Sequence, residues 1–349
     1  MRSFSPVHVK HLLENRFFGG ADFKDICDEH IVVNKAEPYE LEPTVLLPHQ
    51  LENITRLHPE TSKHAEDQRM HGGRGHHAPL EAFRISGVKF RDSGFYKRNW
   101  RFYFPQVAPP GEAVRAAGGS YALASSYSGI QYFGHWLRDD MTTFLLAEEF
   151  AKPFCVRIPD WPHPKQYLDT LDMAWPMIDF ANLDELFFFL DYSQNSNKTA
   201  RYRKMRERLR TKVTPKHDGH RVYLKRGATG AVKRIVTNEA EVLAALEKEN
   251  FIIIDIVEDS LETVLSTLLN ARVLITVEGS QTDHGLYSLA EGAGLLSIVS
   301  PNMFCNTPKD WTSVLNMKYG VVVGETDGGG FSVNVSDLLK TLEMLEAKL

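Results

Sequence analysis

The last third of the chain alternates short apolar runs with longer segments of helical spacing, and this alternation constrains the fold most. The runs are continuous in Ile, Val and Leu, which is typical of strands covered by helices on both faces. Strands alternating with helices pair in parallel, so we expect a doubly wound sheet. The expected strands are 221–225, 251–257, 272–277, 295–299 and 320–323; the expected helices are 239–249, 261–270, 282–291 and 336–347. Capping boxes are expected at Asn238 with Glu241 and at Asp259 with Glu262.

A second set of alternating elements lies earlier in the chain. Strands fit 121–125, 154–158 and 186–190, and helices fit 136–150 and 165–180 between them. The chain has 349 residues, and a single core usually stops growing beyond roughly 250–300 residues. We therefore predict an α/β protein with two Rossmann-like domains facing a cleft, preceded by an irregular or β-rich N-terminal region. The predicted parts are 1–115, 116–215 and 216–349.

The N-terminal part shows little regular patterning. Five prolines interrupt residues 38–79, and the segment 58–77 carries five histidines and three glycines, which favours a long exposed loop. Aromatic and β-branched residues at 83–88 and 95–104 predict a β-hairpin. Further along, residues 198–226 hold twelve Lys or Arg against two acids, and we interpret 199–210 as a basic helix followed by a hinge at 215–219.

Composition excludes several classes of protein. The net charge is −5, from 40 Lys and Arg against 45 Asp and Glu, which argues against a dedicated nucleic-acid binder. No apolar run reaches the ~18–20 residues of a membrane span, and the first residues lack the apolar core of a signal peptide. The three cysteines lie far apart. We therefore expect a cytoplasmic protein without disulfides. For the basic helix, peripheral association with an anionic membrane stays open beside a purely solvated face.

The first candidate site is the segment 134–140, Gly-His-Trp-Leu-Arg-Asp-Asp. On a helix, His135 and Asp139 are four residues apart and share one face. A carboxylate can hold an imidazole in one tautomer and support its protonated form, so this pair could serve as a general base for a hydroxyl. The alternative is a histidine that only packs or caps, beside a solvated pair of aspartates.

The second candidate site follows the strand 221–225. Lys225 and Arg226 stand at its carboxyl end, next to a glycine, and Arg234 comes shortly before the helix that begins near Asn238. Cations at this edge of a parallel sheet suit a phosphate or diphosphate, which an arginine can bind through two hydrogen bonds. A solvated basic loop is the alternative.

The third candidate site joins the strand 272–277 to a helix. Glu278, Gly279 and Ser280 come first, and His284 follows within reach. A glycine lets the backbone approach a ligand closely, and the N–H groups at the start of the helix favour an anion. The signal is weak by itself, because many loops of α/β proteins have this composition. No GxGxxG sequence is present here, which argues against a dinucleotide fold.

Metal chemistry has little support in the sequence. The histidines at 71–77 lack the firm spacing of a metal site, so we interpret them as polar loop residues. No two aspartates are separated by a single residue, so the D-x-D pattern by which many sugar-nucleotide transferases hold a metal is absent. Cations and a helix N-terminus could neutralise a diphosphate instead.

The order of these motifs resembles glycosyltransferase family 61. The resemblance rests on 135–137 (His-Trp-Leu), 223–226 (Tyr-Leu-Lys-Arg), 234–239 (Arg-Ile-Val-Thr-Asn-Glu) and 278–280 (Glu-Gly-Ser), and it covers roughly residues 120–300. Eukaryotic members tend to have His-Gly-Ala at the last motif, so this chain is more similar to bacterial enzymes of capsule or surface polysaccharides.

The resemblance implies a GT-B fold and inverting, metal-independent transfer from a nucleotide sugar, most often a UDP-sugar, to a glycan hydroxyl. It implies His135 as the base, supported by Asp139. For the donor diphosphate and nucleotide it implies Lys225, Arg226, Arg234, Glu278, Gly279, Ser280 and His284, with no cofactor. Two alternatives stay open from the residues: a non-catalytic protein that binds a sugar nucleotide or glycan in a polysaccharide assembly complex, and an unrelated α/β enzyme acting on a phosphate ester.

Overall fold

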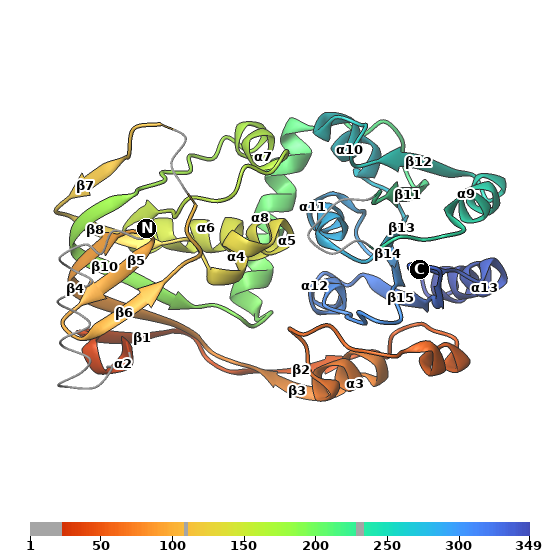
Figure 1. Ribbon diagram of the computed structural model, residues 1–349, viewed down its shortest axis with the longest axis horizontal. Coiled ribbons are helices and arrows are strands. Elements are labelled where there is room, and N and C mark those ends of the chain that lie inside the picture. The colour runs from red at the N-terminus through yellow and green to blue at the C-terminus, as the bar shows by residue number, and fades with distance from the viewer. Residues whose placement is uncertain (1–22, 108–110, 228–233) are drawn as a thin grey trace. The chain divides into compact units, whose positions relative to one another are not determined.

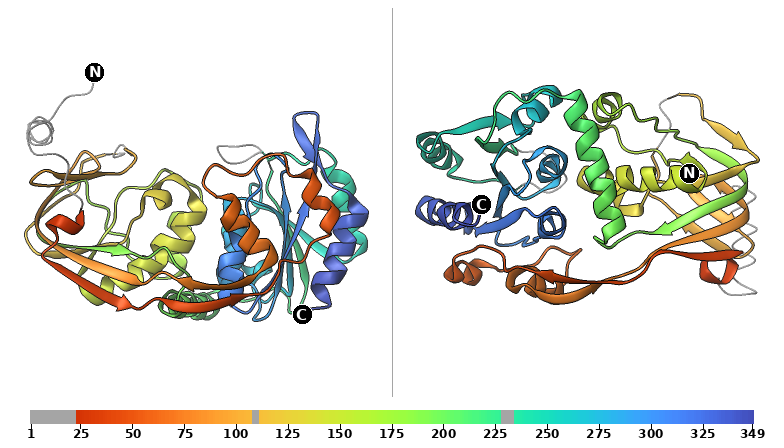
Figure 2. Two further views of the ribbon diagram at one scale, coloured as in Figure 1. Left: turned by 90° about the horizontal axis from the view of Figure 1, so that it is seen from below. Right: turned by 180° about the vertical axis from the view of Figure 1, so that it is seen from behind.

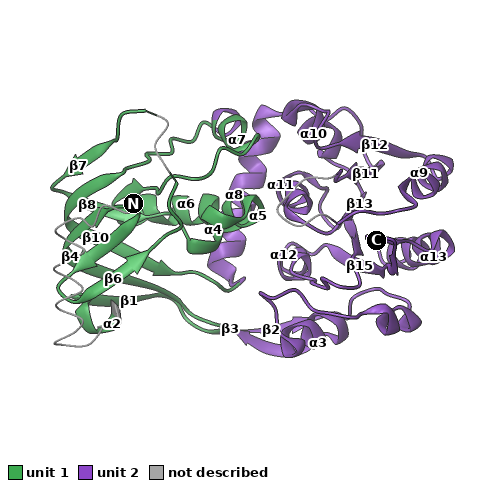
Figure 3. Ribbon diagram, viewed as in Figure 1, with its two compact units in different colours: residues 1–36, 78–168, 172–193 green, residues 37–77, 169–171, 194–349 purple. Residues whose placement is uncertain are grey.

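The structure is a computed structural model that describes residues 23–107, 111–227 and 234–349, which group into two compact units (Figure 3). Unit 1 contains the described residues up to Ala36, with Ala78–Leu168 and Asp172–Ser193. Unit 2 contains Glu37–His77, Asp169–Leu171 and Gln194–Leu349. The residues before 116 are thus divided between both units, whereas the sequence predicts them as a part of their own.

Unit 2 is built on a five-stranded sheet in which every pair is parallel. The strand order is β12-β11-β13-β14-β15, so β11, which comes first in the chain among the strands of this sheet, lies second in the sheet. The strands are β11 (Arg221–Lys225), β12 (Phe251–Asp255), β13 (Val273–Val277), β14 (Gly294–Val299) and β15 (Lys318–Val323). All residues of β13 and β14 are buried, which explains why their sequences are apolar except for Thr276 and Ser297. The predicted doubly wound sheet is confirmed.

Helices cover both faces of this sheet (Figure 1). One face carries α9 (Glu239–Lys248) and α13 (Val335–Glu346); the other carries α10 (Leu261–Leu268), α11 (His284–Ser288) and α12 (Pro308–Val314). The predicted helix 282–291 is wrong in extent, because Ser280–Asp283 form a 3₁₀ turn and α11 ends at Ser288. Both capping predictions are corrected as well. Ser260, not Asp259, caps α10, and the Asn238 side chain holds the backbone of Val333 instead of capping α9.

The N-terminal segment of unit 2 is regular, contrary to the predicted long loop. β2 (Glu37–Leu41) pairs antiparallel with β3 (Gly73–His77), and α3 (Lys63–His71) precedes β3; Figure 2 shows this ribbon and helix in orange. A 3₁₀ turn, Pro48–Asn53, lies between β2 and α3. Ser62 caps α3 by accepting a hydrogen bond from Ala65 N–H. Val45 bridges to Gly320, so this segment also covers the outer edge of β15.

Buried charges attach α3 to the rest of unit 2. Arg69 donates two hydrogen bonds to Asp310, at 2.9 and 2.7 Å, and one to Glu66 at 2.6 Å. Glu66 is 1% exposed, and its second oxygen accepts from Asn306 N–H. These contacts bind a mainly polar helix to the core.

Three further elements complete unit 2. The basic helix is confirmed as α8 (Ser196–Lys212), and its buried Arg206 donates to the carbonyls of Leu286 and Leu289 at the end of α11. Strands β16 (Glu325–Asp327) and β17 (Gly330–Ser332) form a small hairpin after β15.

Unit 1 is an eight-stranded mixed sheet, so the predicted Rossmann-like pattern holds for only part of it. Its main order is β6-β5-β4-β10-β8-β9; β1 also pairs with β4, and β7 with β10. β8 is parallel to both β9 and β10, as the predicted β-α-β-α-β order requires. β1, β4, β5 and β6 are antiparallel to their neighbours. The strands are β1 (Glu29–Asn34), β4 (Leu80–Arg91), β5 (Gly94–Lys97), β6 (Trp100–Tyr103), β7 (Arg115–Ala117), β8 (Ser120–Leu123), β9 (Lys152–Phe154) and β10 (Phe180–Leu190).

The helices of unit 1 are short apart from one. They are α2 (Phe23–Ile26), α4 (Tyr127–Gln131), α5 (Phe133–His135), α6 (Met141–Phe150) and α7 (Pro164–Thr170), with a π-helical turn at Trp136–Asp140 between α5 and α6. The helix predicted at 165–180 is wrong beyond Thr170. The predicted hairpin proves to be a three-stranded meander of β4, β5 and β6. Across the ranges that the structure describes, no helix combines the length and apolarity needed to cross a bilayer.

Candidate functional site

The sheet of unit 2 changes winding direction between β11 and β13. The chain leaves β11 for β12 on one side, and later strands are added on the other side, beyond β13. In open α/β sheets, ligands bind outside the carboxyl ends of the strands at such a switch point. Arg226 directly follows β11, and Glu278 directly follows β13. The structure therefore brings the second and third candidate sites together at the place where this fold binds ligands.

Two arginines and a glutamate form the centre of this site. Arg234 Nε lies 2.8 Å from Glu278 Oε2, and both side chains are 10% exposed. Arg226 is 4% exposed. Burial lowers the pKa of Arg226 to about 10, and the positive charge of Arg234 adds to this shift. Burial and the charge of Arg234 both disfavour the charged form of Arg226, and an incoming anion would stabilise it.

The same buried environment shifts the pKa of Glu278 upward, whereas it shifts the pKa of Arg226 downward. Burial raises the pKa of Glu278, while the charges of Arg234 and Arg226 oppose the rise. Asp283, which is also buried, raises the pKa further. The site thus contains its own anions, and a ligand carrying more than one negative charge would compete with them for the arginines.

Gly279 is required by the packing of Arg226. A Cβ at this position would lie 2.8 Å from Arg226 Nε and 2.7 Å from Gln281 Oε1, closer than side chains approach. Its φ of 155° also favours glycine. Ser280 follows at the start of the 3₁₀ turn and is partly exposed. The Gln281 amide donates to the carbonyl of Val277, which fixes the turn against the end of β13.

Two of the predicted site residues have surroundings that differ from this centre. Lys225 Nζ forms an ion pair of 2.8 Å with Asp255 at the end of β12, and that hydrogen bond raises the pKa of the lysine. Successive strand residues point to opposite faces, so the side chains of Lys225 and Arg226 diverge. His284 is fully buried at the start of α11. Lys225 is therefore engaged with β12, and His284 is buried in the helix that follows the 3₁₀ turn.

The first candidate site lies in unit 1, where α5 continues into a π-helical turn. His135 Nδ1 lies 2.8 Å from Asp139 Oδ2, as the predicted spacing requires. The two side chains are 30% and 21% exposed, so the pair is accessible to a substrate. When Nδ1–H donates to Asp139, Nε2 carries the lone pair that can accept a proton, and Arg138 Nη2 lies 3.4 Å from this nitrogen. π-helical turns of this kind are often found at functional sites.

Sequence reasoning missed Arg138 at this site. Its Nη2 lies 2.8 Å from His135 Nδ1 and 3.3 Å from Asp139 Oδ2, and its side chain is 10% exposed. The i, i+3 spacing from His135 on a helix was a signal that could have revealed it. Arg138 and Asp139 favour opposite tautomers, because the arginine donates to Nδ1 whereas the carboxylate accepts from it.

Asp140 has a different function from its neighbour. Its carboxylate is fully buried and accepts a hydrogen bond from Ser126 N–H at 3.0 Å. It also fills the space beside Gly129, where a Cβ would lie 2.0 Å from Asp140 Oδ2. Asp140 therefore attaches the turn before α4 to the π-helical turn, which keeps His135 in place.

A doubly wound parallel sheet with Arg226 and Glu278 at its switch point defines an α/β protein of the class whose ligand sites lie at the carboxyl ends of the strands. A family model described as Glycosyltransferase 61 matches residues 133–296, from the start of α5 into β14. Residues 133–296 thus form a glycosyltransferase family 61 domain, which supports a glycosyltransferase that transfers a sugar from a donor to an acceptor glycan. No functionally curated protein matches the chain. The matched segment contains every predicted site residue, from His135 to His284.

Proposed function

We propose that this glycosyltransferase transfers a sugar from a nucleotide sugar, a UDP-sugar in our view, to a hydroxyl group of a glycan, with inversion and without a metal ion. The observation that carries the proposal is the buried Arg226 packed against Gly279 at the switch point of unit 2, together with Arg234, which pairs with Glu278. A nucleoside diphosphate is the leaving group of such a reaction, and its negative charge is complementary to the positive charges of the two arginines.

The donor site is assigned to unit 2. Arg226 and Arg234 would bind the diphosphate and stabilise the charge that develops on it as the bond to the sugar breaks. The backbone at Gly279 and Ser280 would approach the phosphates closely. Glu278 holds Arg234 at 2.8 Å in the structure, and we propose that the diphosphate competes for that arginine when the donor binds. Lys225 would affect the donor site only indirectly, through its ion pair with Asp255 of β12, and His284 only through the position of α11.

The base is assigned to unit 1. We propose that His135 Nε2 takes the proton of the acceptor hydroxyl while the oxygen of that hydroxyl forms the new bond to the anomeric carbon. The bond from that carbon to the diphosphate oxygen breaks in the same step, which inverts the anomeric centre. Asp139 would hold Nδ1–H and stabilise the imidazolium. Arg138 would limit the negative charge of Asp139, since it contacts the same oxygen at 3.3 Å.

We also propose a GT-B type enzyme in which unit 2 is the donor domain. The order 2-1-3-4-5 of its parallel strands and the family match support this assignment. A cytoplasmic enzyme of capsule or surface polysaccharide would fit the free thiols of Cys27, Cys155 and Cys305. In the described residues no group of three potential ligands is placed to hold a metal ion. Activity that falls in EDTA and returns with Mg²⁺ or Mn²⁺ would contradict the proposed metal-independent reaction.

The test is the binding of UDP in the presence of EDTA, followed as the melting temperature of the protein. A ligand at 100 times its Kd adds about 2.7 kcal/mol to native stability, which raises the melting temperature of a domain of this size by several degrees. Arg226→Ala should abolish most of that rise. Arg272→Ala is the matched control, because Arg272 is an exposed arginine at the other end of the same sheet, before β13. Equal stabilisation of both variants by UDP would place the donor elsewhere.

A further inference from the structure

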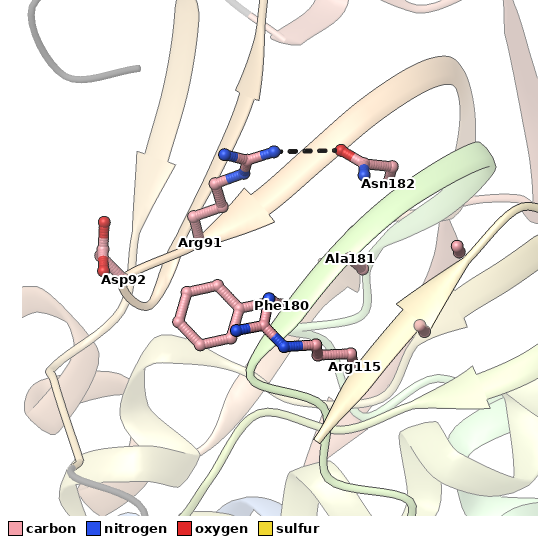
Figure 4. Close-up of a pocket in the computed structure, with 8 residues that line it drawn as sticks. Arg91, Asp92, Arg115, Phe180, Ala181 and Asn182 are labelled. Carbon is pink, nitrogen blue, oxygen red and sulfur yellow. Dashed lines mark hydrogen bonds between the residues drawn. The ribbon is translucent and has the colours of Figure 1, made fainter. Parts of the chain in front are cut away.

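Unit 1 has a hollow of about 430 Å³ that the proposed reaction does not use (Figure 4). It lies where β4 ends and where β10 begins, with β7 beside β10. Its lining includes Arg91, Asp92, Arg115, Phe180, Ala181 and Asn182. Sites for small ligands usually have volumes of roughly 300–1,000 Å³, so a mono- or disaccharide unit fits.

The protein positions both arginines of the hollow without neutralising them. Arg115 lies over the ring of Phe180, with its guanidinium carbon 4.8 Å from the ring centroid. Arg91 donates a long hydrogen bond of 3.5 Å to the side-chain carbonyl of Asn182. Figure 4 shows the two guanidinium groups on either side of the start of β10. A cation over an aromatic ring loses rotational freedom, so Arg115 is ordered before any ligand binds.

The absence of carboxylate partners separates these two arginines from others in unit 1. Arg84 pairs with Glu29 and Glu185, and Arg157 pairs with Asp179. Among the residues that the structure describes, no ion pair is formed by Arg91 or Arg115. Two ordered guanidinium groups beside one hollow attract an anion, and each is shaped to grip a carboxylate with two N–H groups.

We propose that this hollow binds a carboxylate-bearing sugar unit of an acidic glycan. The choice of a glycan rests on the proposed function, since the acceptor there is a glycan. The carboxylate of Asp92 stands at the rim and is exposed. It can accept hydrogen bonds from sugar hydroxyls, whereas it repels a densely charged phosphate. The ring of Phe180 and the methyl groups of Ala116 and Ala181 supply apolar surface for the non-polar face of a sugar.

The experiment compares cellobiouronic acid with cellobiose, in which a CH₂OH group stands in place of the carboxylate, and includes inorganic phosphate as a third probe. Binding to the full chain is measured by calorimetry or by NMR saturation transfer, without donor. We expect the acid to bind, and cellobiose and phosphate to bind at least about tenfold more weakly. Added salt should lower the affinity for the acid. Arg91→Gln and Arg115→Gln should each reduce the affinity for the acid by about tenfold.

The matched control is Arg101→Gln. Arg101 also lies over an aromatic ring, with its guanidinium carbon 5.9 Å from the centroid of Tyr103, but it does not line the hollow. This variant should keep the affinity for the acid, and the melting temperatures of all three variants should confirm that they fold. Equal binding of acid and cellobiose, an equal or stronger affinity for phosphate, or an unchanged affinity in Arg115→Gln would overturn the inference.

The outcome can be separated from that of the proposed function. UDP binding and its loss in Arg226→Ala test unit 2 and need no acidic sugar. If UDP binds as proposed and cellobiouronic acid does not bind, only the inference about the hollow fails. If the acid binds through Arg91 and Arg115 while UDP does not bind, the donor site fails and the hollow stands.

Discussion

Replacing Gly279 by alanine tests whether the switch point of unit 2 holds the donor diphosphate. The added Cβ would lie 2.8 Å from Arg226 Nε, whereas ordinary contacts begin at 3.4 Å. Arg226 must then move by the difference, about 0.6 Å, and Gln281 by slightly more. Arg226 is buried, so it cannot rotate into solvent without losing its packing.

The size of the effect follows from this displacement. A misplacement of about 1 Å in a site can cost on the order of 100-fold in rate. We expect kcat/KM to fall by roughly 10- to 100-fold, with weaker binding of UDP, because a group that contacts the diphosphate would be displaced. The backbone conformation of Gly279 is one that only glycine adopts readily, so native stability should also fall, by about 1–3 kcal/mol.

Gly292→Ala separates the loss of stability from the loss of the site. Gly292 has a φ of 68°, and a Cβ there would meet nothing within 4 Å. It precedes β14, at the opposite end of the sheet from Gly279. This variant should lose about 1–2 kcal/mol of stability and keep its affinity for UDP. The assay is UDP titration by calorimetry, with urea unfolding for both proteins. If Gly279→Ala binds UDP within twofold of Gly292→Ala, Arg226 does not contact the diphosphate.

Three other predictions follow from named contacts. Asp139→Asn should lower kcat by about 100-fold or more, because the imidazole loses its charged partner, and leave UDP affinity unchanged; Glu148→Gln, an exposed change on α6, should leave kcat intact. Arg69→Ala should lower the free energy of unfolding by about 3–5 kcal/mol, since Glu66 stays buried without its cation; Arg74→Ala, whose pair with Glu40 is exposed, should change the urea midpoint little. Burial raises the pKa of Asp179, but hydrogen bonds from Arg157 and Val114 N–H outweigh it, so the pKa lies below 3.8. The ionised Asp179 therefore stabilises the fold above pH 3.8, and this stabilisation is lost as pH falls further; the stability difference between wild type and Arg157→Gln should shrink over that acidic range, and a constant difference would contradict the assignment.

The strands of unit 2 could be predicted because their burial leaves a direct trace in the sequence. A strand covered on both faces is mostly apolar, and β13 and β14, which are buried at every position, contain only Thr276 and Ser297 as polar residues. The order of the elements then determines which strand ends meet at the switch point. The positions of Arg226 and Glu278 at one edge of the sheet therefore follow from the order of strands and helices in the chain.

The helix α3 left no such trace. Only Glu66 and Met70 are buried among its nine residues, and one of these is a charged residue. Its attachment depends on Arg69 and Asp310, which are 241 residues apart in the chain. No periodic pattern records an ion pair across such a distance, so histidines and prolines around α3 favoured a loop.

The two neighbouring aspartates show where residue spacing stops being informative. Asp139 and Asp140 are chemically identical and adjacent, and the helical spacing from His135 selects Asp139 correctly. What the spacing cannot show is that Asp140 is fully buried against Gly129 and holds the turn before α4, or that Arg138 shares the oxygen of Asp139. Both facts depend on the π-helical turn, which shifts the faces that residues 136–140 present. The His135–Asp139 pair is therefore predictable from local sequence, whereas the place of Arg138 beside it is set by the turn.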